Sequence, residues 1–270
     1  MTDEPSRVPT PPWWSNSESR KAERSERRRV RHSAREPRAV AAGGPPREAI
    51  TQEKVADAAL AIIDADGLEG LTVRRLAHEL GLGTMTLYWY VRNKDEILDL
   101  VSDRLLAGLG FPPAGQDWRD SVRGGLHAVR AALLKHARAV PVMVGRGSFG
   151  PNGLRLIEGS IAVLRSAGFD PDAAADAYFT ISNFVTGFCT FETSAPSSLS
   201  QSGVDMKGYG QMLREYIESL PLEAYPNLQA AAPRIFGASL DDRFDFGVDC
   251  LVAGLEAKLQ AARNKGVAQS

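Results

Sequence analysis

Apolar residues recur at helical spacing from about residue 51, and the first two stretches predict short amphipathic helices. The first helix is expected from Thr51 to Asp66, ending at Gly67. Its apolar stripe consists of Val55, Ala58, Ala59, Ile62 and Ile63. The second helix is expected to begin at an N-cap, Thr72, and to end at Gly81. Its buried face would consist of Val73, Leu76, Ala77 and Leu80.

After the glycine turn, Thr84 is expected to cap a third helix in which Leu87 and Val91 face inward. This arrangement leaves a polar and aromatic set outside, namely Thr84, Met85, Thr86, Tyr88, Trp89 and Tyr90. So many exposed aromatic side chains need a binding partner. Two short helices around a glycine turn are typical of a helix-turn-helix, which indicates DNA binding.

The run from Asn93 to Glu96 has the pattern of a capping box and predicts a further helix that continues to about Gly108. Lys94 would then lie at a helix N-terminus, where backbone N–H groups and an ammonium group favour a phosphate. The alternative is that Lys94 is exposed to solvent and binds nothing.

From Asp117 onward the pattern is helical, without an alternating stretch that is typical of a strand. Helices are expected over Pro171–Glu192 and Leu240–Ala262, and Ser194–Val204 is expected to form a longer loop. The sequence therefore predicts an all-α protein. A three-helix head, residues 47–94, would be joined to a larger helical bundle, residues 95–265.

The N-terminal 46 residues differ in composition from the rest, because Pro, Ser, Arg and Glu dominate and no apolar period is present. They are expected to form a disordered basic tail. Residues 1–50 hold 11 of the 32 Lys/Arg and 7 of the 33 Asp/Glu, a balance of +4; the remaining 21 and 26 give −5. The run from Arg27 to Arg31 either adds phosphate contacts or is simply solvated.

Composition excludes several other classes. No segment approaches the roughly 18 uninterrupted apolar residues of a membrane span, and no signal-peptide core opens the chain, so we expect a cytoplasmic protein. The two cysteines, Cys189 and Cys250, lie far apart in apolar runs and are expected to be buried. No clustered histidines or Cys-x-x-Cys pattern indicates a metal, and no cofactor is expected.

The head resembles the N-terminal domain of the TetR repressor family. The resemblance rests on the helix from Thr51, on Leu71–Arg74, on Leu80-Gly81, and on Thr86–Val91 followed by Lys94. In the tetracycline-repressor branch a histidine stands where this chain has Tyr90, which affects the expected operator sequence and leaves the binding mode unchanged. The resemblance extends over most of residues 48–262, through Trp118, Ala131–His136, Gly168-Phe169, Ala177-Tyr178, Asn183-Phe184, Gly187, Phe244–Gly247 and Gly254–Glu256.

This resemblance implies DNA contacts at nine positions: Thr72, Arg74, Thr84, Met85, Thr86, Tyr88, Trp89, Tyr90 and Lys94. Arg74 and Lys94 are expected to bind phosphates, and the residues from Thr84 to Thr86, with Tyr90, to approach base edges. The expected function is that of a dimeric repressor that a small-molecule effector releases from a palindromic operator.

The position at which that branch carries a magnesium-binding histidine is Met143 here, and a thioether is a poor ligand for a hard cation. Arg146 and Ser160 replace a threonine and a glutamine, and the acidic position is either Phe191 or Glu192. We therefore predict no binding of magnesium-tetracycline. An apolar or planar ligand is expected instead, and the candidate pocket residues, which could equally be core, are Val129, Met143, Ser160, Phe184 and Phe188.

The helices Pro171–Glu192 and Leu240–Ala262 are expected to form a four-helix seam across a two-fold axis, although both could be internal core. Two other functions stay open. One is a DNA-binding repressor without an effector. The other is a helical-bundle enzyme, which the absence of Glu-x-x-His pairs among the four histidines disfavours.

Overall fold

The computed structural model describes residues 50–110, 116–147, 149–199 and 206–268, which form helices and their connections and include no β-strand. The all-α prediction is confirmed. The chain divides into two compact units, Met1–Val101 and Ser102–Ser270. The boundary between the units falls inside helix α5 (Lys94–Leu105), where Ser102 and Asp103 bond to other residues of the second unit. The predicted N-terminal tail lies outside the described residues.

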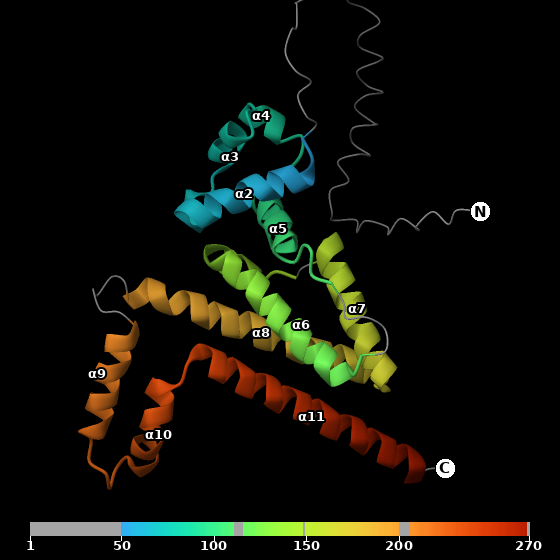
Figure 1. Ribbon diagram of the computed structural model, residues 1–270. Coiled ribbons are helices and arrows are strands. Elements are labelled where there is room, and N and C mark those ends of the chain that lie inside the picture. The colour runs from blue at the N-terminus through green and yellow to red at the C-terminus, as the bar shows by residue number, and fades with distance from the viewer. Residues whose placement is uncertain (1–49, 111–115, 148, 200–205, 269–270) are drawn as a thin grey trace, which may run out of the picture. The chain divides into compact units, whose positions relative to one another are not determined.

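The first unit contains α2 (Gln52–Asp66), the 3-10 turn η1 (Leu68–Gly70), α3 (Val73–Glu79), α4 (Thr84–Leu87) and the first turns of α5 (Figure 1). Two predicted N-caps are confirmed. The Thr51 hydroxyl accepts from Lys54 N at 3.2 Å, and the Thr72 hydroxyl accepts from Arg75 N at 3.1 Å. Fully buried side chains between these helices include Val55, Ile63, Leu71, Leu76 and Leu87.

The turn between α3 and α4 differs from the sequence prediction in one respect. Gly81 has φ +63°, a left-handed conformation that glycine adopts without strain, as the predicted helix stop requires. The N-cap of α4, however, is Gly83 rather than Thr84. Gly83 is extended, and its carbonyl accepts from the amides of Thr86 and Leu87, so Thr84 is already the first helical residue.

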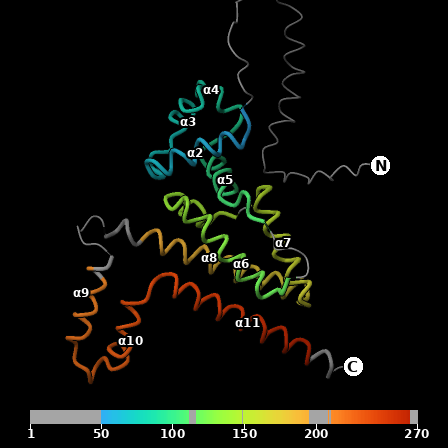
Figure 2. Tube along the Cα trace, viewed as in Figure 1, coloured from blue at the N-terminus to red at the C-terminus, as the bar shows by residue number. Residues whose placement is uncertain are grey.

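The second unit contains α6 (Trp118–Lys135), the 3-10 helix η2 (Ala137–Met143), α7 (Pro151–Ala167), α8 (Pro171–Leu199), α9 (Met206–Glu218), α10 (Pro226–Gly237) and α11 (Leu240–Ala268). Helix α8 packs against α6, α7, η2 and α11, and α9 packs on α10 (Figure 2). Residues 194–199, predicted as the start of a loop, continue α8, and α11 extends to Ala268, past the predicted end.

Aromatic side chains fill the core between α8 and α11. Phe244 is fully buried, stacks on Phe184 with centroids 5.4 Å apart, and meets the edge of Phe188 at 5.1 Å. Gly247 is needed for this close approach, because a Cβ there would lie 2.5 Å from the Phe184 ring. Side-chain packing therefore fixes how α11 lies against α8.

A row of ion pairs, which we call the ion-pair ladder, joins α6 to α11. Three arginines and His127 of α6 each face an acid of α11, and the residue numbers rise on one helix as they fall on the other, so the helices are antiparallel. The pairs are Arg119–Glu256, Arg123–Asp249 at 2.8 Å, His127–Asp245 at 3.3 Å and Arg130–Asp241 at 2.7 Å.

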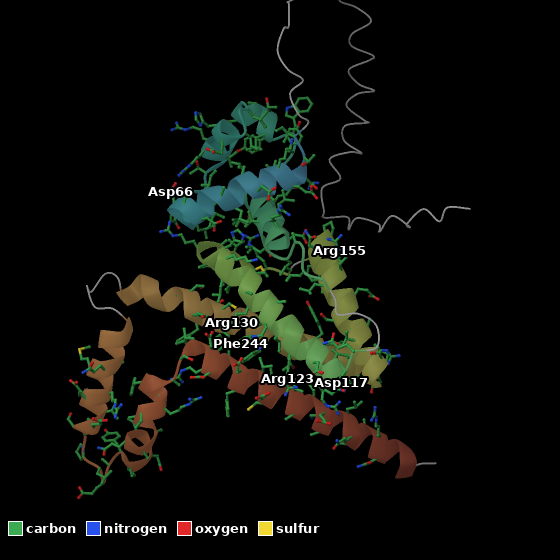
Figure 3. The ribbon with its side chains drawn as sticks, viewed as in Figure 1. Asp66, Asp117, Arg123, Arg130, Arg155 and Phe244 are labelled. Atoms are coloured by element: carbon green, nitrogen blue, oxygen red, sulfur yellow. The ribbon has the colours of Figure 1, made fainter. Side chains whose placement is uncertain are left out.

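Arg130 differs from the other ladder residues because its guanidinium is buried (Figure 3). It donates two hydrogen bonds to the Glu192 carboxylate of α8, at 2.9 and 2.7 Å, and lies 4.8 Å from the Phe244 ring centroid. The hydrogen bonds that Arg130 donates to Glu192 hold the pKa of Arg130 above its ordinary value, although burial lowers it. One buried cation thus links α6, α8 and α11.

Breaking the buried Arg130–Glu192 pair is expected to destabilise the protein far more than breaking an exposed pair of the ion-pair ladder. Glu192→Gln leaves the buried Arg130 charge poorly compensated, and we expect a loss of about 3 kcal/mol in the free energy of unfolding. Asp249→Asn removes a pair whose side chains are 38% and 67% exposed, so a loss below about 1 kcal/mol is expected. Urea denaturation at one protein concentration measures both, and equal losses would contradict this account of Arg130.

Candidate DNA-binding surface and ligand pocket

The large apolar side chains that the first unit exposes lie on α4 and the turn that follows it. Met85 is 76% exposed, Trp89 61% and Tyr88 45%, whereas Leu87 between them is fully buried. Thr86 is exposed, and Thr84 and Tyr90 are half-buried. A four-residue helix anchored by one buried leucine therefore presents large side chains outward. Single exposed apolar residues are common, but three within five positions favour a contact surface.

The basic residues around this surface have different environments. Arg74 is exposed, while Arg75 forms an ion pair with Asp66. Lys94 is exposed at the first position of α5, which Asn93 caps, because Asn93 Oδ1 accepts from Glu96 N at 2.8 Å. The Glu96 carboxylate reaches back to Arg92 N at 2.6 Å, one residue earlier than an ideal capping box. Lys94 and Arg74 are thus placed where an anion can approach them.

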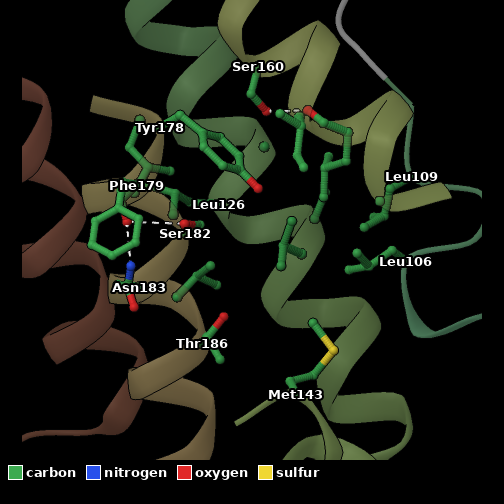
Figure 4. Close-up of a pocket in the computed structure, with 18 of the residues that line it drawn as sticks. Leu106, Leu109, Leu126, Met143, Ser160, Tyr178, Phe179, Ser182, Asn183 and Thr186 are labelled. Carbon is green, nitrogen blue, oxygen red and sulfur yellow. Dashed lines mark hydrogen bonds between the residues drawn. The ribbon is translucent and has the colours of Figure 1, made fainter. Parts of the chain in front are cut away.

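A cavity of about 640 Å³ lies in the second unit, among α6, α7, α8 and the residues that follow α5. Its wall is mainly aliphatic, with Leu106, Leu126, Ile157 and Val185 among the lining residues (Figure 4). A volume and lining of this kind suit a small apolar molecule.

Three of the five predicted pocket residues, Val129, Met143 and Ser160, line this cavity. Phe184 and Phe188 do not; they lie in the aromatic cluster around Phe244, because α8 directs them toward α11. Sequence analysis missed the polar part of the wall on α8, which is Tyr178, Ser182, Asn183, Thr186 and Thr190. The signal was present, since Tyr178, Ser182, Thr186 and Thr190 recur at every fourth residue.

The polar side chains of the wall are mostly committed as donors to their own helices. Ser160 Oγ donates to Leu156 O at 2.7 Å, and Ser182 Oγ and Asn183 Nδ2 donate to Phe179 O at 3.0 and 2.8 Å (Figure 4). Their oxygen lone pairs are left to accept. Burial raises the pKa of Tyr178, so its hydroxyl, which points into the cavity, stays protonated.

The second unit offers little support for a metal site at the positions considered above. Glu192 is engaged by Arg130, and Phe191 is 62% exposed. Within the described part of the chain, no three His, Cys, Asp or Glu side chains are placed to share a metal ion. That magnesium-tetracycline does not bind stays a prediction.

The two cysteines have different environments. Burial raises the pKa of the Cys189 thiol to about 11, and the Glu192 carboxylate adds to this effect, so an unreactive thiol is expected. Cys250 is exposed, which contradicts the sequence prediction for it.

Comparison with known proteins decides the family. Residues 55–101 match the model described as bacterial regulatory proteins, tetR family, and residues 111–259 match the tetracyclin repressor-like C-terminal domain. The chain belongs to the TetR family. An HTH-type transcriptional regulator of Saccharopolyspora erythraea is 33% identical over 209 residues, covering 77% of this chain and 85% of the relative. The class A tetracycline repressor of Escherichia coli is 30% identical, covering 77% and 91%.

Solved structures of ActR from Streptomyces coelicolor show the same fold. The apo structure has a TM-score of 0.71 and 34% identity, covering 79% of this chain and 98% of ActR. The complex of ActR with actinorhodin also has a TM-score of 0.71, with 33% identity, covering 78% and 99%.

This TetR-family chain is therefore a DNA-binding transcriptional regulator, and family membership places it outside the enzymes. None of its described helices combines the length and apolar character that a membrane span requires.

Proposed function

We propose that this TetR-family protein is a homodimeric repressor that binds a palindromic operator and is released by a small, mainly apolar molecule. One observation carries the proposal: the chain joins an exposed aromatic and polar α4 surface to a second unit that holds a cavity of about 640 Å³. Differential affinity of the effector for two arrangements of the dimer would change the spacing of the recognition helices.

The proposed DNA contacts divide by chemistry. Arg74 and Lys94 bind phosphates, since both are exposed cations and Lys94 begins a helix. Met85 and Thr86 approach thymine methyl groups, and Thr84 and Tyr90 approach neighbouring base edges. Thr72 caps α3 beside this surface, and Tyr88 and Trp89 support the backbone contact.

Removing a base-reading group is expected to change sequence preference. Thr86→Ala and Tyr90→Ala should each reduce discrimination at particular operator positions by about 1–3 kcal/mol, as measured by competition among operator variants at fixed salt. A uniform loss across all variants would contradict a base-reading role for either residue.

Lys94→Ala is the contrasting change, because a lost phosphate contact weakens all sequences equally and lowers the salt slope by about one. Lys135→Ala, an exposed lysine at the end of α6, is the matched control and should change neither quantity.

The proposed dimer interface consists of two stripes on the outer faces of α8 and α11. Each stripe repeats every fourth residue, so its members share one helix face. The α8 stripe is Phe179, Asn183, Gly187 and Phe191, and the α11 stripe is Phe246, Cys250 and Gly254; all of these are exposed. Phe179, Asn183 and Gly187 also line the cavity, so the α8 stripe borders it. Phe179 and Phe246 are each 68% exposed, which is costly for a lone chain and is relieved by a second copy.

Gly254→Arg is expected to dissociate the dimer without harming the fold of each chain. A Cβ at Gly254 meets nothing within 4 Å in the single chain, and replacing glycine in a helix favours the helix by about 1 kcal/mol. Gly124→Arg, at an exposed and equally open glycine of α6, is the matched control.

Sedimentation equilibrium should show the Gly254→Arg protein as a monomer and the Gly124→Arg protein as a dimer, with circular dichroism unchanged in both. A Gly254→Arg dimer of unchanged affinity would contradict the interface.

The class of effector follows from the cavity wall. Aliphatic residues dominate it, and its polar part offers acceptors on Ser160, Ser182 and Asn183 together with the hydroxyl donor of Tyr178. A mainly apolar molecule with a few polar groups satisfies such a wall. The complex of the related ActR with actinorhodin makes actinorhodin a suitable first probe.

Filling the cavity is expected to abolish the response to the probe while DNA binding is kept. Val129→Trp introduces a large ring into the cavity, and Ala131→Trp, at an exposed position of the same helix, is the control. Actinorhodin should weaken operator binding by the wild type and by Ala131→Trp, and not by Val129→Trp. Equal responses of the three proteins would contradict the assignment of the cavity. Absence of any response, together with absence of thermal stabilisation by a compound library, would favour a repressor without an effector.

A further inference from the structure

Asp103, near the end of α5, is a buried carboxylate that bonds to the start of another helix. It is 6% exposed. Asp103 Oδ1 accepts from Asn152 N at 3.0 Å and from Gly153 N at 2.9 Å, and Oδ2 accepts from Asn152 Nδ2 at 2.8 Å. Both backbone donors belong to the first turn of α7.

Helix α7 has no N-terminal cap of its own. Its N-cap is Gly150, which has no side chain, Pro151 follows, and the first turn contains no acidic residue. The first N–H groups of a helix have no partner within the helix and carry the positive end of its dipole. Asp103 therefore supplies to α7, from α5, the cap and the negative charge that the sequence of α7 lacks.

The same end of α5 touches the walls of the cavity. Gly153, which Asp103 binds, lines the cavity, and so does Leu106, one residue beyond α5. Ser102 Oγ lies 3.2 Å from the sulfur of Met143, which also lines it. Adjacent residues of α5 thus connect to two separate parts of the wall.

Helix α5 runs without a break from Lys94 to Leu105, so Asp103 and Lys94 belong to the same helix. Lys94 is one of the proposed phosphate contacts. A shift of the first turn of α7 would be transmitted to α5 through three hydrogen bonds to a buried charge, which are costly to leave unmade.

We propose that Asp103 is the positioning residue that couples the cavity to DNA binding, by fixing the N-terminus of α7 to α5. The coupling rests on the proposed function. It is reciprocal, so binding of operator DNA must also change how firmly the first turn of α7 is held. This consequence can be measured without knowing the effector.

The test is hydrogen exchange of the α7 amides from Gly153 to Ile157, followed by mass spectrometry, with and without an operator selected from a random DNA pool. In the wild type, operator binding should change this exchange by about fivefold or more. In Asp103→Asn, where an amide NH₂ replaces one acceptor, the operator-induced difference should disappear. Asp99→Asn, at an exposed carboxylate one turn earlier in α5, is the control and should behave as the wild type.

A merely structural cap would give a different result, because loss of Asp103 would then raise α7 exchange equally with and without operator and leave the difference intact. That result would overturn the coupling. So would a wild-type protein in which bound operator leaves the hydrogen exchange of the α7 amides unchanged. Operator affinity is measured first for each protein. A wild type that binds no operator overturns the proposed function, whereas normal operator binding without the exchange difference overturns only the role of Asp103.

Discussion

The buried Arg130 guanidinium is the interaction on which the second unit depends most. It donates two hydrogen bonds to the Glu192 carboxylate, pairs with Asp241 and lies over the Phe188 and Phe244 rings. This one side chain of α6 therefore contacts both α8 and α11. A charge buried in this way is tolerable only when its partners are complete. The need for complete partners fixes the register of α11 against α6. The more exposed pairs of the ion-pair ladder continue the same register along the two helices.

That arrangement decides what remains available for function. Phe184 and Phe188 are drawn into the core, and Glu192 is occupied, so neither the rings nor the carboxylate serve the cavity. Phe179 and Phe191 of α8 and Phe246 of α11 are left exposed outside this core. The cavity wall is consequently aliphatic with a few acceptors. The buried Arg130–Glu192 pair and the packing against Phe244 thus account for the absence of Phe184, Phe188 and Glu192 from the cavity wall.

Much of the first unit could be predicted from sequence because its signals are local. A cap at Thr51 or Thr72, a stop at Gly81 and the cap at Asn93 each depend on residues within four positions, and all are present. The same pattern marked Met85, Tyr88 and Trp89 as exposed and Leu87 as buried. The error at Thr84 was small, since glycine is also an acceptable N-cap.

The second unit was predicted as helical but not in its contacts, because those join residues far apart in the chain. Nothing local shows that Arg130 meets Glu192 or that Asp103 caps α7. The apolar spacing of Phe184 and Phe188 fits a cavity wall and a core equally well, and only packing against Phe244 decides between them. Cys250 was expected inside for the same reason, yet its face of α11 is uncovered in the single chain.

Selection of the purified protein against a random pool of double-stranded DNA tests the central claim most directly. We predict enrichment of an inverted repeat whose half-sites lie about one helical turn apart, as a dimer with paired recognition helices requires. A folded dimer that enriches no sequence at low salt would contradict the account.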